Sequence, residues 1–153
     1  MIEWCKKKYI IVEIIPTAST PEKGEIIQIS ALKLDGLQLL DRFDYRLTDD
    51  KLPIAEMKSW IDYDRESFSY VDDAKKLLIE FQKWAKDLPI LILDETYTPN
   101  YLKNLNNKLV PILPILNEEY CEKIIDNLMN KYHLQPSNYI VDLLYECLIQ
   151  KLS

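Results

Sequence analysis

The first half of the chain consists of apolar runs separated by polar turns. Residues 9–15 (YIIVEII) are β-branched and apolar apart from Glu13, which is typical of a strand covered on both faces of a sheet. Residues 25–34 and 37–45 flank Asp35-Gly36, a pair favoured in the type I′ turns of tight hairpins. The sequence therefore predicts a buried first strand and then two antiparallel neighbours.

A loop and an amphipathic helix follow these strands. Residues 48–69 hold Pro53 and scattered acids without periodicity, which predicts a loop with a short helical turn at about residues 55–60. Over residues 72–86, apolar positions recur at helical spacing, with acids in the first turn and lysines in the last. We expect a helix there, with its apolar stripe against the sheet.

The second half alternates between short apolar runs and helical patterns. Residues 89–93 (PILIL) read as a buried strand, and Thr98 followed by Pro99 fits an N-cap before a short helix that reaches about Asn106. Residues 109–116 predict one more short strand. Two helices should close the chain, the last from about Ser137, with apolar stripes at Cys121, Ile124, Ile125, Leu128 and Met129, and at Ile140, Leu143, Leu144, Cys147 and Leu148.

This order of elements predicts an α/β fold in which helices flank a mixed sheet. We see no internal repeat, linker or low-complexity segment. With 153 residues, 48% of them hydrophobic, the chain has the size and composition of one compact domain that spans residues 1–153.

Composition excludes several classes of function. A formal net charge of −6 argues against binding nucleic acid by bulk electrostatics, because neutralising phosphates requires a basic surface. Only two glycines occur, so a glycine-rich phosphate loop cannot be built. The three cysteines are odd in number and contain no CxxC pair, which indicates neither a zinc site nor a disulfide framework. Because the chain is acidic overall, any nucleic-acid contact should be local.

The chain start and the apolar runs bear on location. Residues 1–8 are too short and too polar for a signal peptide, and no apolar run approaches the roughly 18 residues that span a bilayer. We expect a cytoplasmic protein that does not enter a membrane.

Three stretches resemble the DnaQ-like DEDDh 3′→5′ exonuclease family. YIIVEIIPTASTPEKGEIIQISALKL is similar to that family's first block, a strand ending in Asp-x-Glu-Thr-Thr-Gly, a loop with Ser-Pro and a strand beginning Glu-Ile-Ile. AKKLLIEFQKWAKDLPILILDETYTPNYLKNL resembles its amphipathic helix, buried strand and His-Asn-x-x-Phe-Asp-x-x-Phe-Leu block. The last helix, around Asp142, resembles its His-x-x-x-x-Asp block. The resemblance implies a ribonuclease H-like fold over about the whole chain.

It also implies a particular chemistry. Phosphodiester hydrolysis by two Mg²⁺ or Mn²⁺ ions requires carboxylates on neighbouring elements that hold the ions roughly 3.5–4 Å apart. A histidine then acts as general base for the attacking water. Residues at i and i+2 of one strand share a face, so the family's Asp-x-Glu supplies two ligands from one strand.

This sequence departs from that pattern at four of its five positions. Glu13 stands at the first acid and remains a candidate ligand, whereas Ile15 stands at the second and cannot coordinate a hard cation. Thr98 replaces the third acid, and Ser137 replaces the histidine. Asp142 alone keeps its identity. The resemblance therefore implies degenerate catalytic motifs.

Two acids near the altered third position are candidate replacements. Asp94 and Glu95 follow the strand at residues 89–93, where they would serve either as metal ligands or as acids that favour the dipole of the next helix. The lone histidine, His133, would reach the base position only if its loop were rearranged, and is otherwise a solvated loop residue. Glu13 and Asp142 have structural alternatives too, the first as a buried acid paired with a cation, the second as an acid beside an apolar helix stripe.

We therefore expect a catalytically inactive exonuclease-fold protein without a metal cofactor. It would act as a protein-interaction module, on a protein partner or as a homodimer, or bind a nucleic-acid end; ten tyrosines and three tryptophans suit either role. The alternative is an active divalent-metal-dependent 3′–5′ exonuclease, with a site rebuilt from Glu13, Asp142 and either Asp94 or Glu95, that uses Mg²⁺ or Mn²⁺. A third reading keeps the fold as a scaffold with no nucleic-acid role.

Overall fold

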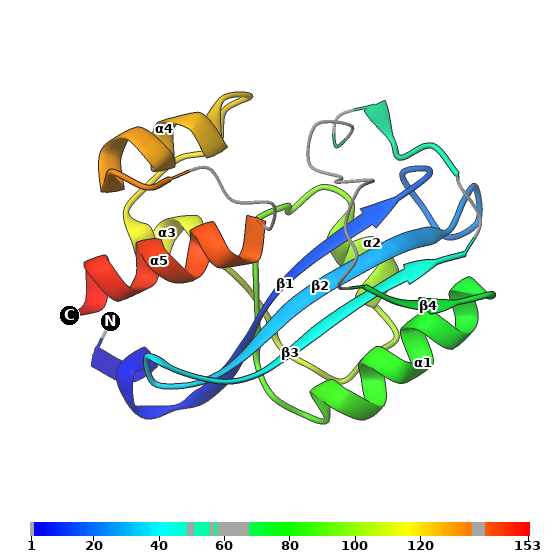
Figure 1. Ribbon diagram of the computed structural model, residues 1–153, viewed down its shortest axis with the longest axis horizontal. Coiled ribbons are helices and arrows are strands. Elements are labelled where there is room, and N and C mark those ends of the chain that lie inside the picture. Colours follow the sequence, from blue (N-terminus) through cyan, green and yellow to red (C-terminus); the bar gives the residue numbers. More distant parts are fainter. Residues whose placement is uncertain (1, 49–50, 56, 58–67, 136–139) are drawn as a thin grey trace.

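The computed structural model describes residues 2–48, 51–55, 57, 68–135 and 140–153. Within these ranges the chain forms a six-stranded mixed sheet flanked by helices, in the order β4-β3-β2-β1-β5-β6 (Figure 1). The strands are β1 (Lys8–Pro16), β2 (Ile26–Asp35), β3 (Gln38–Leu47), β4 (Ser69–Val71), β5 (Ile90–Ile92) and β6 (Leu109–Pro111). The helices are the 3₁₀ helix η1 (Ile2–Lys6) and α1 (Ala74–Ala85), α2 (Thr98–Leu102), α3 (Leu113–Leu116), α4 (Ile124–Tyr132) and α5 (Ile140–Leu152).

Strand pairing confirms the predicted mixed α/β sheet. β1 pairs antiparallel with β2, and β2 pairs antiparallel with β3, as the hairpin pattern indicated. β1 with β5, β5 with β6, and β3 with β4 are parallel pairs. The three long strands thus form the body of the sheet, and the short parallel strands extend it on both sides.

Two hydrophobic cores cover the two faces of the sheet. Tyr9 and Ile11 belong to the core under α3, α4 and α5, whereas Ile10 and Val12 belong to the core under α1 and α2. Side chains of a strand alternate between its faces, so β1 is buried on both sides, as its sequence predicted. Figure 1 shows α5 packed across the long strands on the first of these faces.

The turn between β2 and β3 differs from the prediction. Asp35 pairs with Gln38, so the two central residues are Gly36 and Leu37 rather than Asp35 and Gly36. Of these two only Gly36 has a positive φ, +60°, which is the requirement of a type II′ turn; the type I′ prediction is wrong. The buried Tyr9 hydroxyl donates to the Gly36 carbonyl at 2.8 Å and fixes the turn to β1.

Helix α1 lies within the predicted residues 72–86 but is shorter, and the acids expected in its first turn precede it. Asp73 is the N-cap, and its side chain accepts a hydrogen bond from the Lys75 amide at 2.8 Å. At the other end, the Lys33 ammonium donates to the Trp84 carbonyl at 2.6 Å and lies over the Trp84 ring. This contact ties the end of the helix to β2.

Several element boundaries also differ. β4 begins at Ser69, where a loop was expected, and α2 ends at Leu102 instead of continuing to about Asn106. Cys121 precedes α4 rather than lying on it. The helical turn expected at residues 55–60 falls mostly outside the described residues. None of the helices in the described ranges has the length and apolar character that a membrane crossing requires.

Candidate functional site

A row of polar side chains crosses the three long strands on the face that α5 covers. Glu13 of β1, Gln28 of β2 and Arg46 of β3 are all buried. The Arg46 guanidinium donates to Gln28 Oε1 from Nε at 3.1 Å and from Nη2 at 2.5 Å. Gln28 Nε2 in turn donates to Glu13 Oε1 at 3.3 Å. The register that places Gln28 opposite Arg46 makes this chain of hydrogen bonds possible.

Asp142, in the first turn of α5, is bound by an arginine of β3. Arg42 Nη1 and Nη2 donate to its two carboxylate oxygens at 2.7 and 3.1 Å. Arg42 Nε also donates to Asp44 Oδ2 at 3.2 Å. The hydrogen bond with Asp142 raises the pKa of Arg42 against the opposing effect of burial, so the guanidinium stays charged. The one acid that matches the exonuclease pattern is therefore half of a bidentate ion pair.

Asp94 caps α2. Its Oδ1 accepts from the Thr96 amide at 2.9 Å, and its Oδ2 accepts from the Tyr97 amide at 3.0 Å and from the Thr98 amide at 2.7 Å. The Thr98 hydroxyl also donates to Oδ2, at 3.0 Å. Thr98 is thus the first residue of the helix and not its N-cap, which corrects the sequence prediction. Glu95, by contrast, is exposed.

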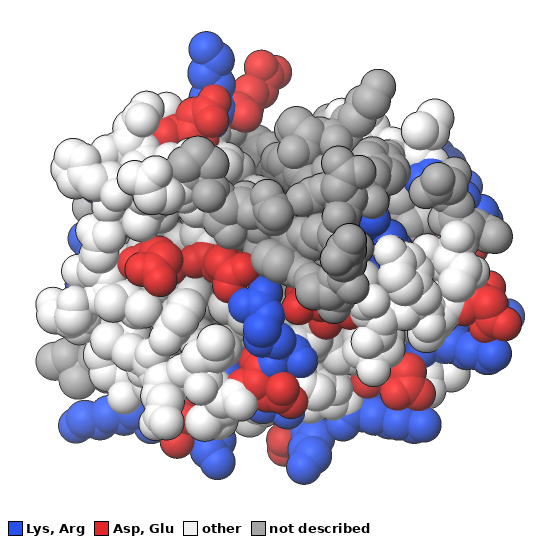
Figure 2. Space-filling view, viewed as in Figure 1, with Lys and Arg blue, Asp and Glu red and all other residues white. Residues whose placement is uncertain are grey.

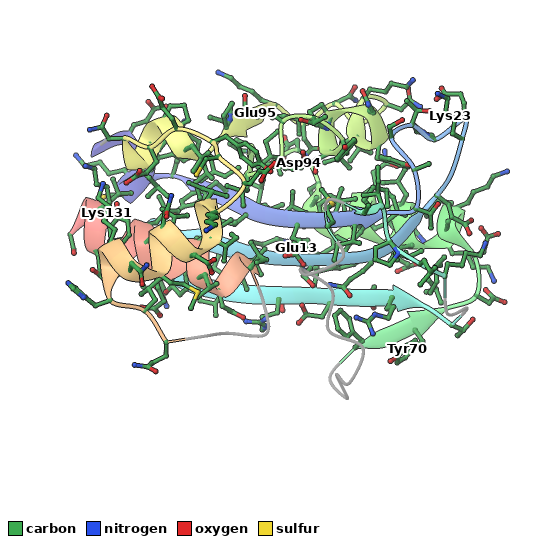
Figure 3. All side chains as sticks on the ribbon, turned by 90° about the horizontal axis from the view of Figure 1, so that it is seen from above. Glu13, Lys23, Tyr70, Asp94, Glu95 and Lys131 are labelled. Carbon is green, nitrogen blue, oxygen red and sulfur yellow. The ribbon has the colours of Figure 1, made fainter. Side chains whose placement is uncertain are left out.

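A small internal cavity of about 10 Å³ brings some of the candidate positions together. Glu13, Asp94 and Thr98 line it, with Ile140 from α5 and with apolar residues of β1 and of the segment after β5. A volume of this size is about that needed for a single water molecule. In Figure 3, Glu13 and Asp94 lie near the middle of the molecule, and Glu95 lies farther out.

The other described candidate positions do not line this cavity. Ile15 is fully buried and belongs to the same core cluster as Ile14. His133 is exposed and ends α4 with a φ of +56°. Ser137 lies outside the described residues. Among the residues that the structure does describe, no three histidine, cysteine, aspartate or glutamate side chains are grouped so that they could hold a metal ion.

Sequence reasoning missed the residues that engage the candidate acids. Arg42 and Arg46 come from β3, and Gln28 comes from β2, far along the chain from Asp142. Arg42 and Arg46 lie four residues apart, so a strand places them on one face, and this spacing was the available signal. Their partners become visible only once the strand register and the position of α5 are known.

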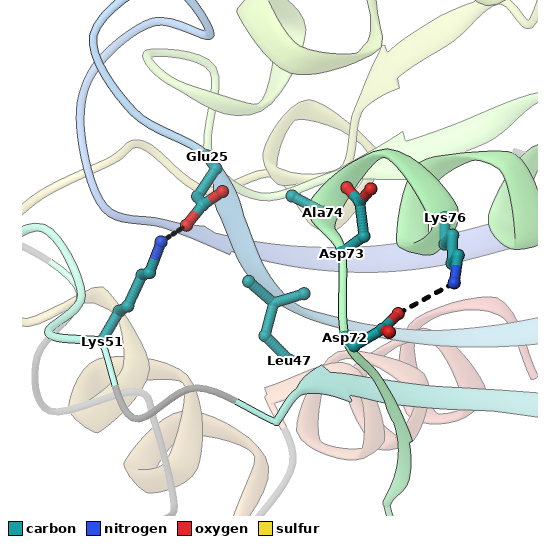
Figure 4. Close-up of a pocket in the computed structure, with 7 residues that line it drawn as sticks. All are labelled: Glu25, Leu47, Lys51, Asp72, Asp73, Ala74 and Lys76. Carbon is teal, nitrogen blue, oxygen red and sulfur yellow. Dashed lines mark hydrogen bonds and ion pairs between the residues drawn. The ribbon is translucent and has the colours of Figure 1, made fainter.

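A second hollow lies at the beginning of α1 (Figure 4). Four of its charged residues form two ion pairs, Lys51 with Glu25, and Lys76 with Asp72 at 3.0 Å. The fifth, Asp73, is the N-cap of α1. On the face that Figure 2 shows, acidic and basic side chains are interspersed, and no large patch of one sign appears on its described part. This surface offers no broad basic track for a phosphate backbone.

Fold comparison assigns this arrangement to the ribonuclease H-like fold of DnaQ-like exonucleases. No protein-family model and no curated protein sequence matches the chain. Among solved structures, it is similar to a zinc-bound complex of E. coli exonuclease I with single-stranded DNA, with a TM-score of 0.57 and 13% identity over 96% of this chain. A structure of exonuclease I that addresses its processivity has a TM-score of 0.60 at 12% identity. A complex of ExoI with SSB-Ct has a TM-score of 0.58, also at 12% identity.

The chain is much shorter than the solved proteins that it resembles. The chain spans about 40% of the length of exonuclease I. An identity of 11–13% shows the fold alone. The predicted fold class is therefore confirmed.

Proposed function

We propose that this chain is a catalytically inactive exonuclease-fold protein that acts as a protein-interaction or nucleic-acid-end-binding module. The hydrogen bonding of Asp94 carries this proposal. Asp94 is the acid that lines the cavity together with Glu13, and both of its oxygens accept from amides at the start of α2. Thr98, at the family's third acidic position, contributes a hydroxyl that is itself bound to Asp94.

Recruiting Asp94 to a cation would be costly. The amides of Thr96, Tyr97 and Thr98 would lose their acceptor. The Thr96 amide is exposed and can bind water instead, whereas Thr98 is a buried residue, and a buried donor left without an acceptor costs about 1–3 kcal/mol. Ile15 offers no oxygen to compensate. These two features favour a fold that has kept its framework and lost its metal ligands.

The neighbours suggest two kinds of partner. Exonuclease I has been seen with single-stranded DNA and with SSB-Ct, so a nucleic-acid end and a protein segment are both reasonable ligands for a chain of this fold. The net charge is −6, and acidic and basic side chains are mixed on the face that Figure 2 shows. Both features favour a protein partner or a second copy of the chain over an extended nucleic acid. We place the protein in the cytoplasm, as its cysteine content suggests.

A digestion assay tests the proposed inactivity. The chain is incubated with 5′-labelled single-stranded DNA and RNA in Mg²⁺ or Mn²⁺, beside Glu13→Ala and Asp142→Ala variants. We expect intact substrate in every lane. Trimming from the 3′ end that needs the metal and that both variants abolish would contradict the proposal, whereas trimming that survives in the variants indicates a contaminating nuclease.

A binding experiment separates the two kinds of partner. Linear single-stranded DNA with a free 3′ end is compared with circular DNA of the same length at low salt, where electrostatic affinity is strongest. Preference for the linear form supports end binding. A dimer mass by light scattering, or a stable complex in a pull-down, with no DNA bound, supports the protein-interaction role.

One observation favours the alternative of an active exonuclease. The cavity does bring Glu13 and Asp94 to the same place, which a rebuilt metal site would need. Crystals grown in manganese test this directly: anomalous density between Glu13, Asp142 and either Asp94 or Glu95 would establish such a site. Carboxylates that lie apart, with no metal between them, would dismiss it.

A further inference from the structure

The two-cation centre that the exonuclease resemblance implies does not fit the residues of this face. Such a centre needs carboxylates with oxygens directed at the ions. Here Asp142 is bound through both oxygens by Arg42, and Glu13 accepts from Gln28. We propose that Arg42 and Arg46 take the place of the cations, so that this face carries its own positive charges and binds no divalent metal. This inference rests on the proposed loss of activity and deepens it.

The Arg42 guanidinium connects two elements of the fold. One guanidinium contacts two carboxylates on different elements, Asp142 of α5 through two nitrogens and Asp44 of β3 through the third. A bridging metal ion does the same when it joins ligands from separate elements. The planar guanidinium suits this role because its donors are fixed in direction.

A chain of side-chain hydrogen bonds joins Arg46 to Glu13 through Gln28. Arg46 is buried, with its guanidinium carbon 4.5 Å from the centre of the Phe68 ring, and donates twice to Gln28. Gln28 relays the interaction by donating to Glu13. An amide between the two charges keeps a cation near the buried acid and satisfies a polar group that would be costly to bury alone.

Both arginines lie on β3, together with Asp44. These three side chains, at every second position of β3, point to one face of the sheet: Arg42, Asp44 and Arg46. A divalent ion entering between Asp142 and Asp44 would meet the Arg42 guanidinium, and like charges at such distances repel strongly in a partly buried site. Metal binding would thus require Arg42 to leave both carboxylates.

The test is a titration with Mn²⁺ alone. Calorimetry measures the binding, and thermal unfolding measures the effect of the ion on Tm. For the wild type we expect no saturable binding and no change in Tm beyond that of an NaCl control of equal ionic strength. Arg42→Met should lower Tm by about 2–4 °C, the range expected when one partly exposed ion pair is lost from a domain of this size. Millimolar Mn²⁺ should restore part of that loss, and Asp142→Asn added to Arg42→Met should remove the response.

Lys76→Met is the matched control, because it breaks an exposed ion pair of α1 with Asp72, away from the arginines of β3. It should leave the response to Mn²⁺ unchanged. Saturable Mn²⁺ binding by the wild type that Asp142→Asn abolishes would overturn the inference, and the wild-type titration decides the matter even if Arg42→Met fails to fold. Such binding without nuclease activity would leave the proposed function standing, whereas trimming in the digestion assay would contradict that function itself.

Discussion

Arg42 and Asp142 lie 100 residues apart in the chain and are joined by two hydrogen bonds, of 2.7 and 3.1 Å. The pair connects the middle of β3 with the first turn of α5. Asp142 is the one acid of the exonuclease pattern whose residue type is unchanged in this sequence. A carboxylate in this position is thus a structural tie between sheet and helix.

We predict a measurable coupling between these two residues. In a double-mutant cycle of Arg42→Ala and Asp142→Ala, the coupling free energy should be roughly 1 kcal/mol, since the pair is bidentate but remains about one-third exposed. Urea unfolding of the four proteins measures it. The exposed Lys76–Asp72 pair serves as the comparison and should show a clearly smaller coupling. Equal couplings for the two pairs would mean that the Arg42 fork has no special role.

Asp94 and its neighbour Glu95 should respond very differently to substitution. Asp94→Ala removes the acceptor of three backbone amides at the start of α2 and should cost about 1–2 kcal/mol of unfolding free energy. Glu95 is exposed, and Glu95→Ala should stay within about 0.5 kcal/mol of the wild type. Chemical denaturation without added metal tests both. An Asp94→Ala protein as stable as the wild type would remove the argument that this carboxylate is committed to the helix.

Gly36 should tolerate no side chain. Its φ is +60°, and a Cβ built there would lie 2.4 Å from the Cys5 carbonyl oxygen. Because the contact is with backbone, it cannot be relieved by a rotamer change, and Gly36→Ala should cost more than about 1 kcal/mol. Gln38→Ala, at an exposed position of the same turn, is the control. Thermal unfolding with indistinguishable Tm values for Gly36→Ala and the wild type would refute the described turn.

Alkaline pH should destabilise the protein through Cys147. Burial raises the pKa of this thiol from its ordinary value of 9.0 to about 12. Above the ordinary value the unfolded chain has released the proton and the folded chain has not, so stability falls as pH rises, by at most about 1.4 kcal/mol per pH unit for one group. Unfolding free energies at a series of pH values between about 8 and 10 test this. Cys147→Ala should show a shallower fall, and an unchanged slope would assign the effect to other groups.

Much of the fold was predictable because its signals are local. The buried run at residues 9–15, the hairpin of β2 and β3, and the amphipathic helix α1 all depend on spacing and residue type within one segment. β4 escaped prediction because its three residues form a strand only by pairing with Tyr45 to Leu47, which no local pattern reveals. The hairpin turn shifted by one residue because Gly36 alone supplies the positive φ.

The elements that carry the candidate residues were predictable, whereas the interactions of those residues were not. The resemblance placed Glu13, Thr98 and Asp142 on β1, α2 and α5, and the structure brings Glu13 and Thr98 to one cavity. What occupies the carboxylates was hidden, because Arg42 reaches Asp142 across 100 residues, and Gln28 reaches Glu13 across strands. Interactions of this kind depend on tertiary register, which spacing along the chain does not contain.

The most direct test of the proposed inactivity is a single-turnover digestion. The chain is held in large molar excess over 5′-labelled single-stranded DNA in Mn²⁺, so that even one slow cleavage per molecule is seen. We predict full-length DNA at every time point. A ladder of 3′-shortened products that appears with the wild type, and is absent with both Glu13→Ala and Asp142→Ala, would show that this site is a working exonuclease.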